Sequence, residues 1–181
     1  WHMENCEVES MKKNVLFVAS EAVPFIKTGG LADVAGSLPK YFDKEQYDVR
    51  VMLPKYLCIP EKWRSQMKYV THFYMDLAWR SQYVGVLEME YAGVHYYFID
   101  NEYYFAGPKP YGYIHEDIEK FAFFSKAALS AMPLLNFKPD IVHCHDWQTG
   151  LIPVYMKERF HDGEFCRNMK SVMTIHNLKF L

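Results

Sequence analysis

A short segment that follows the apolar run Val15–Ala19 has the residue types of an anion-binding turn. It reads Lys27-Thr28-Gly29-Gly30-Leu31-Ala32-Asp33-Val34 and leads into a helical pattern. Glycines let the backbone approach a ligand closely, and free N–H groups at a helix N-terminus favour negative charge. Lys27 adds a mobile cation that can meet a phosphate. The spacing is neither the dinucleotide motif G-x-G-x-x-G nor the phosphate loop G-x-x-x-x-G-K-[ST], and a Gly-Gly pair alone often makes only a turn.

Two more polar clusters follow predicted strands. His145-Asp146-Trp147-Gln148 stands at the end of the predicted strand Ile141–His145, and His176-Asn177 follows the predicted strand Asn168–Ile175. The segment from Glu21 to Asp33 occupies the same position after the first strand. In an open α/β sheet, ligands bind outside the carboxyl ends of parallel strands. The common location of the three clusters predicts one binding site.

Each cluster taken alone also has a structural interpretation. His143 and His145 alternate along a strand, so one of them can be an ordinary core histidine with its hydrogen bonds satisfied. Asp146 can cap the next helix, and Asn177 can make a turn. The pair His143-x-His145 could also suggest a metal site. However, no carboxylate or cysteine completes a ligand set, so we predict no metal.

The elements that must position these residues alternate along the chain. We predict strands at Val15–Ser20, Asp48–Leu53, Ile141–His145 and Asn168–Ile175, and helices at Leu31–Phe42, Asp117–Asn136 and Leu151–Phe160. Pro39 should distort or end the first helix, and Asp117 should cap the second. The strand–helix–strand order predicts a right-handed crossover. The expected fold is therefore α/β and Rossmann-like, with a mainly parallel sheet and helices on both faces.

The middle of the chain has a different character. Tyr69–Leu77, Gln82–Tyr91 and Val94–Asp100 are rich in aromatic and β-branched residues, and Ala92-Gly93 separates the last two segments. This pattern predicts an antiparallel hairpin that extends the sheet. The tyrosine-rich segment 101–113 contains glycines and prolines and is predicted to be a loop.

Composition limits the classes of function. The 181 residues suffice for one domain, and the formal net charge of −2 favours neither a nucleic-acid partner nor an anionic membrane. None of the four cysteines belongs to a C-x-x-C pair, and no apolar run approaches the roughly 20 residues of a membrane span. We expect residues 1–10 to be a disordered extension or a cloning remnant, with the domain over 11–181 and incomplete at its C-terminus.

Three ordered signatures carry a resemblance to a known family. The string from Glu21 to Val34, the stretch from His145 to Leu151 and the stretch from Thr174 to Leu178 resemble the signatures of bacterial glycogen synthases and plant starch synthases (glycosyltransferase family 5). The resemblance implies transfer of glucose from ADP-glucose, or in some members from UDP-glucose, to the non-reducing end of an α-1,4-glucan, with retention and without a cofactor or metal. It also implies a GT-B fold, of which this chain is the N-terminal half-domain. The C-terminal nucleotide-binding domain would be a further partner.

The resemblance also implies roles for particular residues. His176 would contact the transferred glucose near its 6-hydroxyl, and Asp146 would shape the pocket and contact sugar hydroxyls or orient its neighbours. Lys27 would neutralise the diphosphate of the donor. The other expected substrate-binding residues are Glu21, Gly29, Gly30, Asp33, Tyr111 and Asn177. The segment before Tyr111 lacks the arginine or aspartate that similar synthases often carry there.

Two alternatives stay open at this point. Another GT-B sugar-nucleotide transferase, such as a sucrose-synthase-like enzyme, would share the fold but not the Lys-Thr-Gly-Gly-Leu string. A non-catalytic glucan-binding module could use the aromatic residues of the segment 103–113, but it would not need Lys27 beside a Gly-Gly turn. The family resemblance implies a cytoplasmic location in a bacterium or a plastid location in a plant. This chain alone is predicted to be inactive.

Overall fold

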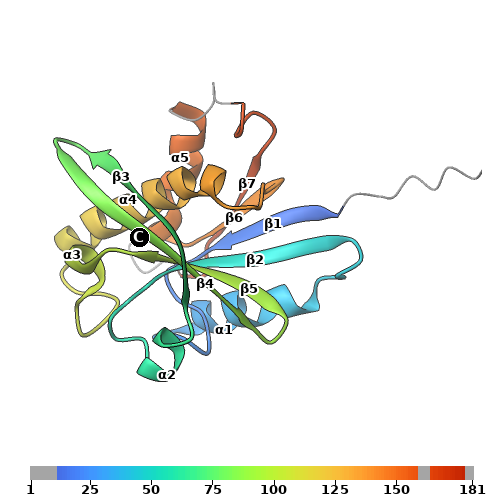
Figure 1. Cartoon of the computed structure of the whole chain (residues 1–181), viewed down its shortest axis with the longest axis horizontal. Helices are drawn as coiled ribbons and strands as arrows, with labels where there is room; N and C mark the ends of the chain where they lie inside the picture. Colours follow the sequence, from blue (N-terminus) through green and yellow to red (C-terminus); the bar gives the residue numbers. More distant parts are fainter. Residues whose placement is uncertain (1–11, 159–163, 178–181) are drawn as a thin grey trace, which may run out of the picture.

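A mixed sheet of seven strands lies at the centre of the computed structural model, which describes residues 12–158 and 164–177 (Figure 1). The strand order is β3-β4-β5-β2-β1-β6-β7. β5, β2, β1, β6 and β7 are parallel, whereas β3, β4 and β5 pair antiparallel. The strands are β1 Lys13–Val18, β2 Tyr47–Pro54, β3 Lys68–Leu77, β4 Arg80–Tyr91, β5 Val94–Asp100, β6 Ile141–His145 and β7 Lys170–Thr174.

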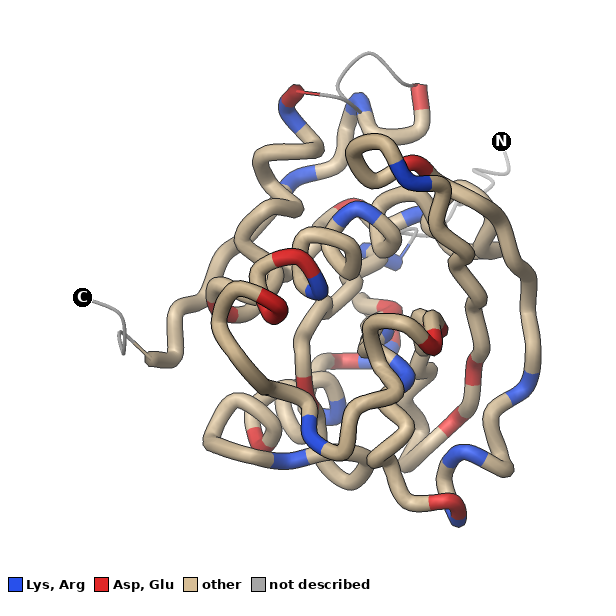
Figure 2. The backbone as a smooth tube through the Cα atoms, turned by 90° about the vertical axis from the view of Figure 1, so that its left-hand side faces the viewer, with Lys and Arg blue, Asp and Glu red and all other residues tan. Residues whose placement is uncertain are grey.

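Helices cover both faces of this sheet. In Figure 1, α1 and α2 lie on one side and α4 and α5 on the other. The helices are α1 Gly30–Ser37, α2 Glu61–Arg64, α3 Glu102–Phe105, α4 Ile114–Ala131 and α5 Leu151–Glu158, with 3-10 turns η1 Leu38–Tyr41, η2 Met132–Leu134 and η3 Trp147–Thr149. The prediction of a Rossmann-like sheet with an antiparallel extension is confirmed. Figure 2 shows basic and acidic residues interspersed along the described backbone.

The central strand shows why the sequence folds this way. Leu16, Phe17 and Val18 of β1 are all fully buried, because β1 lies between β2 and β6 and helices cover both of its faces. A parallel strand covered on both sides requires a continuous apolar run rather than an alternating one. The run in the sequence therefore predicted the position of β1 within the sheet as well as its existence.

Most predicted boundaries agree with the structure. Val94–Asp100 and Ile141–His145 match β5 and β6 to the residue. Ala92 and Gly93 have positive φ angles of 51° and 74°, as a tight hairpin turn requires. The helix predicted to end near Pro39 ends at Ser37 and continues as the 3-10 turn η1. The predicted extension 1–10 and the last two residues of the helix predicted at 151–160 lie outside the described residues.

Two expectations were wrong. Asp117 does not cap α4, because the helix begins at Ile114 with Tyr113 in the capping position. The Asp117 carboxylate instead accepts a hydrogen bond from the Gly112 backbone N–H at 2.9 Å and holds the preceding segment. The segment 101–113 is not entirely a loop, since it contains α3. Asn101 caps that helix by accepting from the Tyr104 N–H at 3.1 Å.

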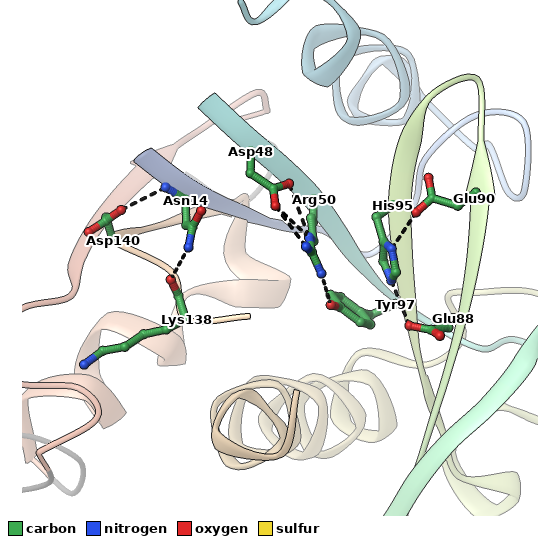
Figure 3. Close-up of polar contacts among 9 residues, drawn as sticks. All are labelled: Asn14, Asp48, Arg50, Glu88, Glu90, His95, Tyr97, Lys138 and Asp140. Atoms are coloured by element: carbon green, nitrogen blue, oxygen red, sulfur yellow. Dashed lines mark hydrogen bonds and ion pairs between the residues drawn. The ribbon is translucent and has the colours of Figure 1, made fainter. Parts of the chain in front are cut away.

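A network of polar side chains stabilises the amino ends of the parallel strands (Figure 3). Arg50 donates to Asp48 and to the Tyr97 hydroxyl, the latter at 2.6 Å, and its guanidinium lies 4.2 Å from the centre of the Phe137 ring. Asn14 bonds to Asp140 and to the Lys138 carbonyl, which joins the start of β1 to the start of β6. These contacts stabilise the end of the sheet opposite the predicted site, as do those of His95 with Glu88 and Glu90.

Gly36 is required where α1 packs on the loop after β1. A Cβ atom at this position would lie 2.3 Å from the Val23 carbonyl oxygen and 2.5 Å from Val23 Cγ2. The Val23 N–H also donates to the Ala32 carbonyl at 3.0 Å. This close contact fixes α1 against the loop that leads to Lys27.

We therefore expect Gly36→Ala to destabilise the protein although alanine favours helices. Overpacking costs about 1–3 kcal/mol, more than the roughly 0.5–1 kcal/mol gained in helix propensity. The melting temperature followed by circular dichroism should fall by several degrees. Gly30→Ala is the matched control, because a Cβ there would meet no atom within 4 Å. Equal melting temperatures for the two variants would contradict the packing argument.

Candidate functional site

The candidate site lies where the strand order reverses. From β1 the chain builds outward to β2 and β5, and it then returns to place β6 and β7 on the other side of β1. The carboxyl ends of β1 and β6 therefore flank a topological switch point, the usual ligand position in open α/β sheets. A cavity of about 770 Å³ opens there. All predicted site residues except Lys27 and Asp33 line it: Glu21, Gly29, Gly30, Tyr111, Asp146, His176 and Asn177.

Glu21 organises the loop that leads into α1. Its side chain is buried, and one carboxylate oxygen accepts a hydrogen bond from the Thr28 backbone N–H at 2.6 Å. Burial raises the pKa of this carboxyl, and the negative charge of Asp146 adds a smaller contribution. Because Glu21 engages the backbone amides of both Thr28 and Gly29, an incoming anion would meet the N–H groups from Gly30 onward. Gly29 occupies the N-cap position of α1, so no side chain caps the first N–H groups of this helix. Gly30 leaves open space beside the backbone.

Lys27 and Asp33 do not line the cavity, and they bind each other. Lys27 Nζ is 2.7 Å from both carboxylate oxygens of Asp33, and both side chains are 53% exposed. Exposed ion pairs of this kind contribute only about 0–1 kcal/mol. A phosphate could therefore replace Asp33 as the partner of Lys27 at little cost. The predicted lysine is thus paired with a carboxylate, and its neighbour in sequence, Thr28, lines the cavity.

Asp146 has an unusual backbone conformation and a partner on the neighbouring strand. Its φ and ψ angles are 57° and −178°, a region that non-glycine residues rarely adopt. Such strain costs about 1–3 kcal/mol and gathers at functional sites. Asp146 Oδ1 accepts a hydrogen bond from the His176 backbone N–H at 2.6 Å, and the Asp146 N–H donates to the Thr174 carbonyl at 2.9 Å. Asp146 makes no side-chain cap on the turn that follows, so it joins the ends of β6 and β7 instead.

Three histidines, His143, His145 and His176, form a connected group next to Asp146. His143 and His145 point to the same side of β6, with ring centroids 4.2 Å apart. His143 Nε2 is 2.7 Å from the Thr174 hydroxyl, and His145 Nδ1 is 2.9 Å from His176 Nε2. Burial lowers the pKa of both strand histidines, to about 3 for His145. His176 is the member of the group that lines the cavity.

Tyr111 forms the side of the cavity nearest α4. Its hydroxyl is 2.7 Å from the Ser20 hydroxyl at the end of β1, and burial raises its pKa. Other lining residues were not predicted, among them Thr28, Asp117, Trp147 and Gln148. Trp147 and Gln148 belong to one of the polar clusters that follow predicted strands, so their position after a strand was a usable signal. Asp117 gave no such signal, because its place depends on how α4 packs.

The described part of the chain offers no evident metal site or membrane span. Among residues 12–158 and 164–177, no three His, Cys, Asp or Glu side chains are grouped so that they could hold a metal ion. No helix within these ranges is long and apolar enough to cross a bilayer.

Comparisons with known proteins agree on one family. Residues 14–181 match the family model described as starch synthase catalytic domain. The glycogen synthase of Lachnospira eligens is 76% identical over 168 residues, which are 93% of this chain and 35% of that protein. The glycogen synthase of Anoxybacillus flavithermus is 51% identical over 166 residues, 92% of this chain and 34% of that protein. The chain thus spans about a third of the length of these relatives.

A solved structure supports the same relationship. The catalytic domain of starch synthase IV from Arabidopsis thaliana, bound to ADP and acarbose, superposes with a TM-score of 0.75 at 28% sequence identity. The match covers 92% of this chain and 34% of that one.

Proposed function

The chain belongs to the starch synthase catalytic domain family, and on this basis we propose that the protein containing it transfers glucose from ADP-glucose to the non-reducing end of an α-1,4-glucan with retention. The observation that carries the proposal is the cavity at the switch point, where Glu21, Asp146 and His176 come together from three distant segments. The similar Arabidopsis structure is bound to ADP and acarbose, which supports a nucleotide and a saccharide as ligands of this cavity.

The residues divide into two groups by chemistry. The donor diphosphate would lie against the start of α1, where Gly29 and Gly30 leave room and Lys27 supplies a positive charge. The glucosyl group would lie deeper, against His176 and Asp146, with Tyr111 and Asn177 at its sides. A C-terminal nucleotide-binding domain would close the cavity from the other side. The bacterial relatives favour a cytoplasmic enzyme.

The arrangement suits a reaction that separates charge. As the bond to the donor breaks, negative charge grows on the leaving diphosphate and the sugar becomes oxocarbenium-like. The amides of α1 and Lys27 would stabilise the first, and the carboxylate of Asp146 would supply electron density near the second. Neither Asp146 nor His176 needs to attack the sugar, and the proposal requires no cofactor.

The proposal is tested with the protein extended to the length of its relatives. It should incorporate labelled glucose from ADP-glucose into glycogen, and the product should be digested by an enzyme specific for α-1,4 bonds. UDP-glucose and sucrose with a nucleoside diphosphate serve as alternative substrates. Faster transfer from another donor would favour a different GT-B transferase. Glycogen binding without transfer from any donor would favour a glucan-binding module and overturn the proposal.

Lys27→Ala in the extended protein should weaken use of the donor. Loss of a charged hydrogen bond to the diphosphate costs about 1.5–3 kcal/mol, or about 10- to 150-fold in kcat/KM for ADP-glucose. The KM for glycogen should change little, because the acceptor carries no phosphate. Lys27→Arg should rescue only part of the loss, since a planar guanidinium replaces a compact ammonium.

Two further variants make the Lys27 result interpretable. Lys44→Ala removes another exposed lysine, just before β2 at the opposite end of the sheet, and should leave the kinetics unchanged. Asp33→Asn removes the partner of Lys27 but keeps the lysine, so it should not reproduce the loss. Unchanged donor kinetics in Lys27→Ala would remove this residue from the site.

A further inference from the structure

His145 is a fully buried histidine, and one of its ring nitrogens approaches a ring nitrogen of His176. The two ring planes are 12° apart, and the centroids are separated by 5.2 Å. His145 Nδ1 lies 2.9 Å from His176 Nε2, which is a hydrogen-bond distance. The next residue, Asp146, accepts the backbone N–H of His176. Two consecutive residues at the end of β6 thus hold both the ring and the backbone of His176.

The position of His145 is poorly suited to a purely structural histidine. Its Nε2 atom is buried and has no hydrogen-bond partner among the described residues. Burying a polar atom without a partner is unfavourable, and a phenylalanine would fill the same space without this penalty. The core histidine with satisfied hydrogen bonds that the sequence allowed at this position is therefore not what the structure contains. The unfavourable burial of His145 Nε2 indicates that the histidine is retained for another role.

The arrangement of donors and acceptors defines that role. A neutral imidazole has one N–H donor and one bare acceptor nitrogen. If His145 carried its proton on Nε2, that N–H would be buried without an acceptor, and buried N–H groups of this kind are rare. With the proton on Nδ1, His145 donates to His176 Nε2. His176 must then carry its own proton on Nδ1.

We propose that His145 is a positioning residue that fixes the ring orientation and the tautomer of His176. It leaves the Nδ1–H of His176 as a neutral donor for an oxygen in the cavity that His176 lines. Hydroxyl oxygens of a sugar are acceptors of this kind, so the inference about substrate rests on the proposed function. The low pKa of His145, caused mainly by burial, is consistent with a His145 ring that stays neutral at physiological pH.

The tautomers can be measured in this chain without any variant or substrate. In the chain labelled with ¹⁵N-histidine, couplings between the ring nitrogens and ring protons distinguish Nδ1–H from Nε2–H. Near pH 7 both His145 and His176 should be neutral and protonated on Nδ1. An Nε2–H form of His176 would overturn the proposal, as would a positively charged His145.

The effect on the reaction is tested in the protein extended to the length of its relatives. His145→Phe keeps the ring volume but loses the hydrogen bond, so kcat should fall about 10- to 100-fold with little change in the KM for glycogen. His145→Asn places an amide N–H near the former Nδ1 and should recover most of the rate. His143→Phe is the matched control, because His143 shares the strand face but bonds to Thr174 rather than to His176. It should stay within about threefold of the unaltered enzyme.

The possible results separate the two proposals. If His143→Phe were as harmful as His145→Phe, or if His145→Asn were no better than His145→Phe, the positioning role would be wrong. If the unaltered extended protein transferred no glucose, the proposed function would fail, while the NMR measurement would still decide the tautomer.

Discussion

The 181-residue chain by itself should transfer no measurable glucose from ADP-glucose to glycogen. It spans about a third of the length of its relatives, and its cavity is formed by the ends of one sheet. Holding two reactants in the correct geometry can lower a barrier by about 7–11 kcal/mol, and a single wall cannot supply that positioning. Label incorporation into glycogen over several hours, compared with a buffer blank, measures the effect.

The extended protein, at the same molar concentration, is the positive control for this measurement. Circular dichroism should show that the chain under assay is folded, so that inactivity is not mistaken for unfolding. Turnover by the folded chain above the blank would show that this part carries a complete site, and it would contradict the need for a second wall.

Asp146→Ala in the extended protein should cause one of the largest losses of any single substitution. The change removes the acceptor of the His176 N–H at 2.6 Å and a negative charge from the cavity. The loss of one preorganised electrostatic group typically costs about 100- to 1,000-fold in kcat. The substitution does not relieve the backbone strain, because alanine at a φ of 57° is also strained. Steady-state kinetics with ADP-glucose and glycogen varied separately measure the loss.

Two companion substitutions separate the charge from the hydrogen bond. Asp146→Asn keeps an oxygen that can accept from His176 but removes the charge, whereas Asp146→Gly relieves the backbone strain and removes both. If positioning of His176 dominates, the asparagine variant should retain most of the activity. If the charge dominates, it should resemble the alanine variant. An alanine variant within about threefold of the unaltered enzyme would exclude Asp146 from the proposed chemistry.

The sequence predicted the fold well because its strongest signals are local. The apolar run at Val15–Ala19 and the hairpin turn at Ala92-Gly93 each follow from a few adjacent residues. The site could be located for a related reason, since polar residues after parallel strands must meet at one edge of the sheet. The comparisons agree with three predictions from the sequence: the starch synthase family, the Rossmann-like half of a GT-B fold, and the glycogen or starch synthase assignment.

The details that were not predicted depend on contacts between distant segments. The bond between His145 and His176 requires the register in which His145 pairs with Thr174, and no local pattern specifies it. The buried Glu21 was expected to bind substrate, but its hydrogen bond to the Thr28 amide shows that it also shapes the loop. The strained backbone of Asp146 and the pairing of Lys27 with Asp33 likewise appear only in the folded chain.

The neighbours of β1 have a consequence for how the protein forms during synthesis. β1 leaves the ribosome before the other strands of this sheet, yet one of its two neighbours is β6, and Asn14 bonds to Asp140 across 126 positions of sequence. At about 5–20 residues per second, one edge of this buried central strand waits roughly 6–25 s for its partner. Pairings between such distant segments also form slowly once both are present. During these seconds the nascent chain carries an unpaired edge of β1, and unpaired strand edges are templates for aggregation.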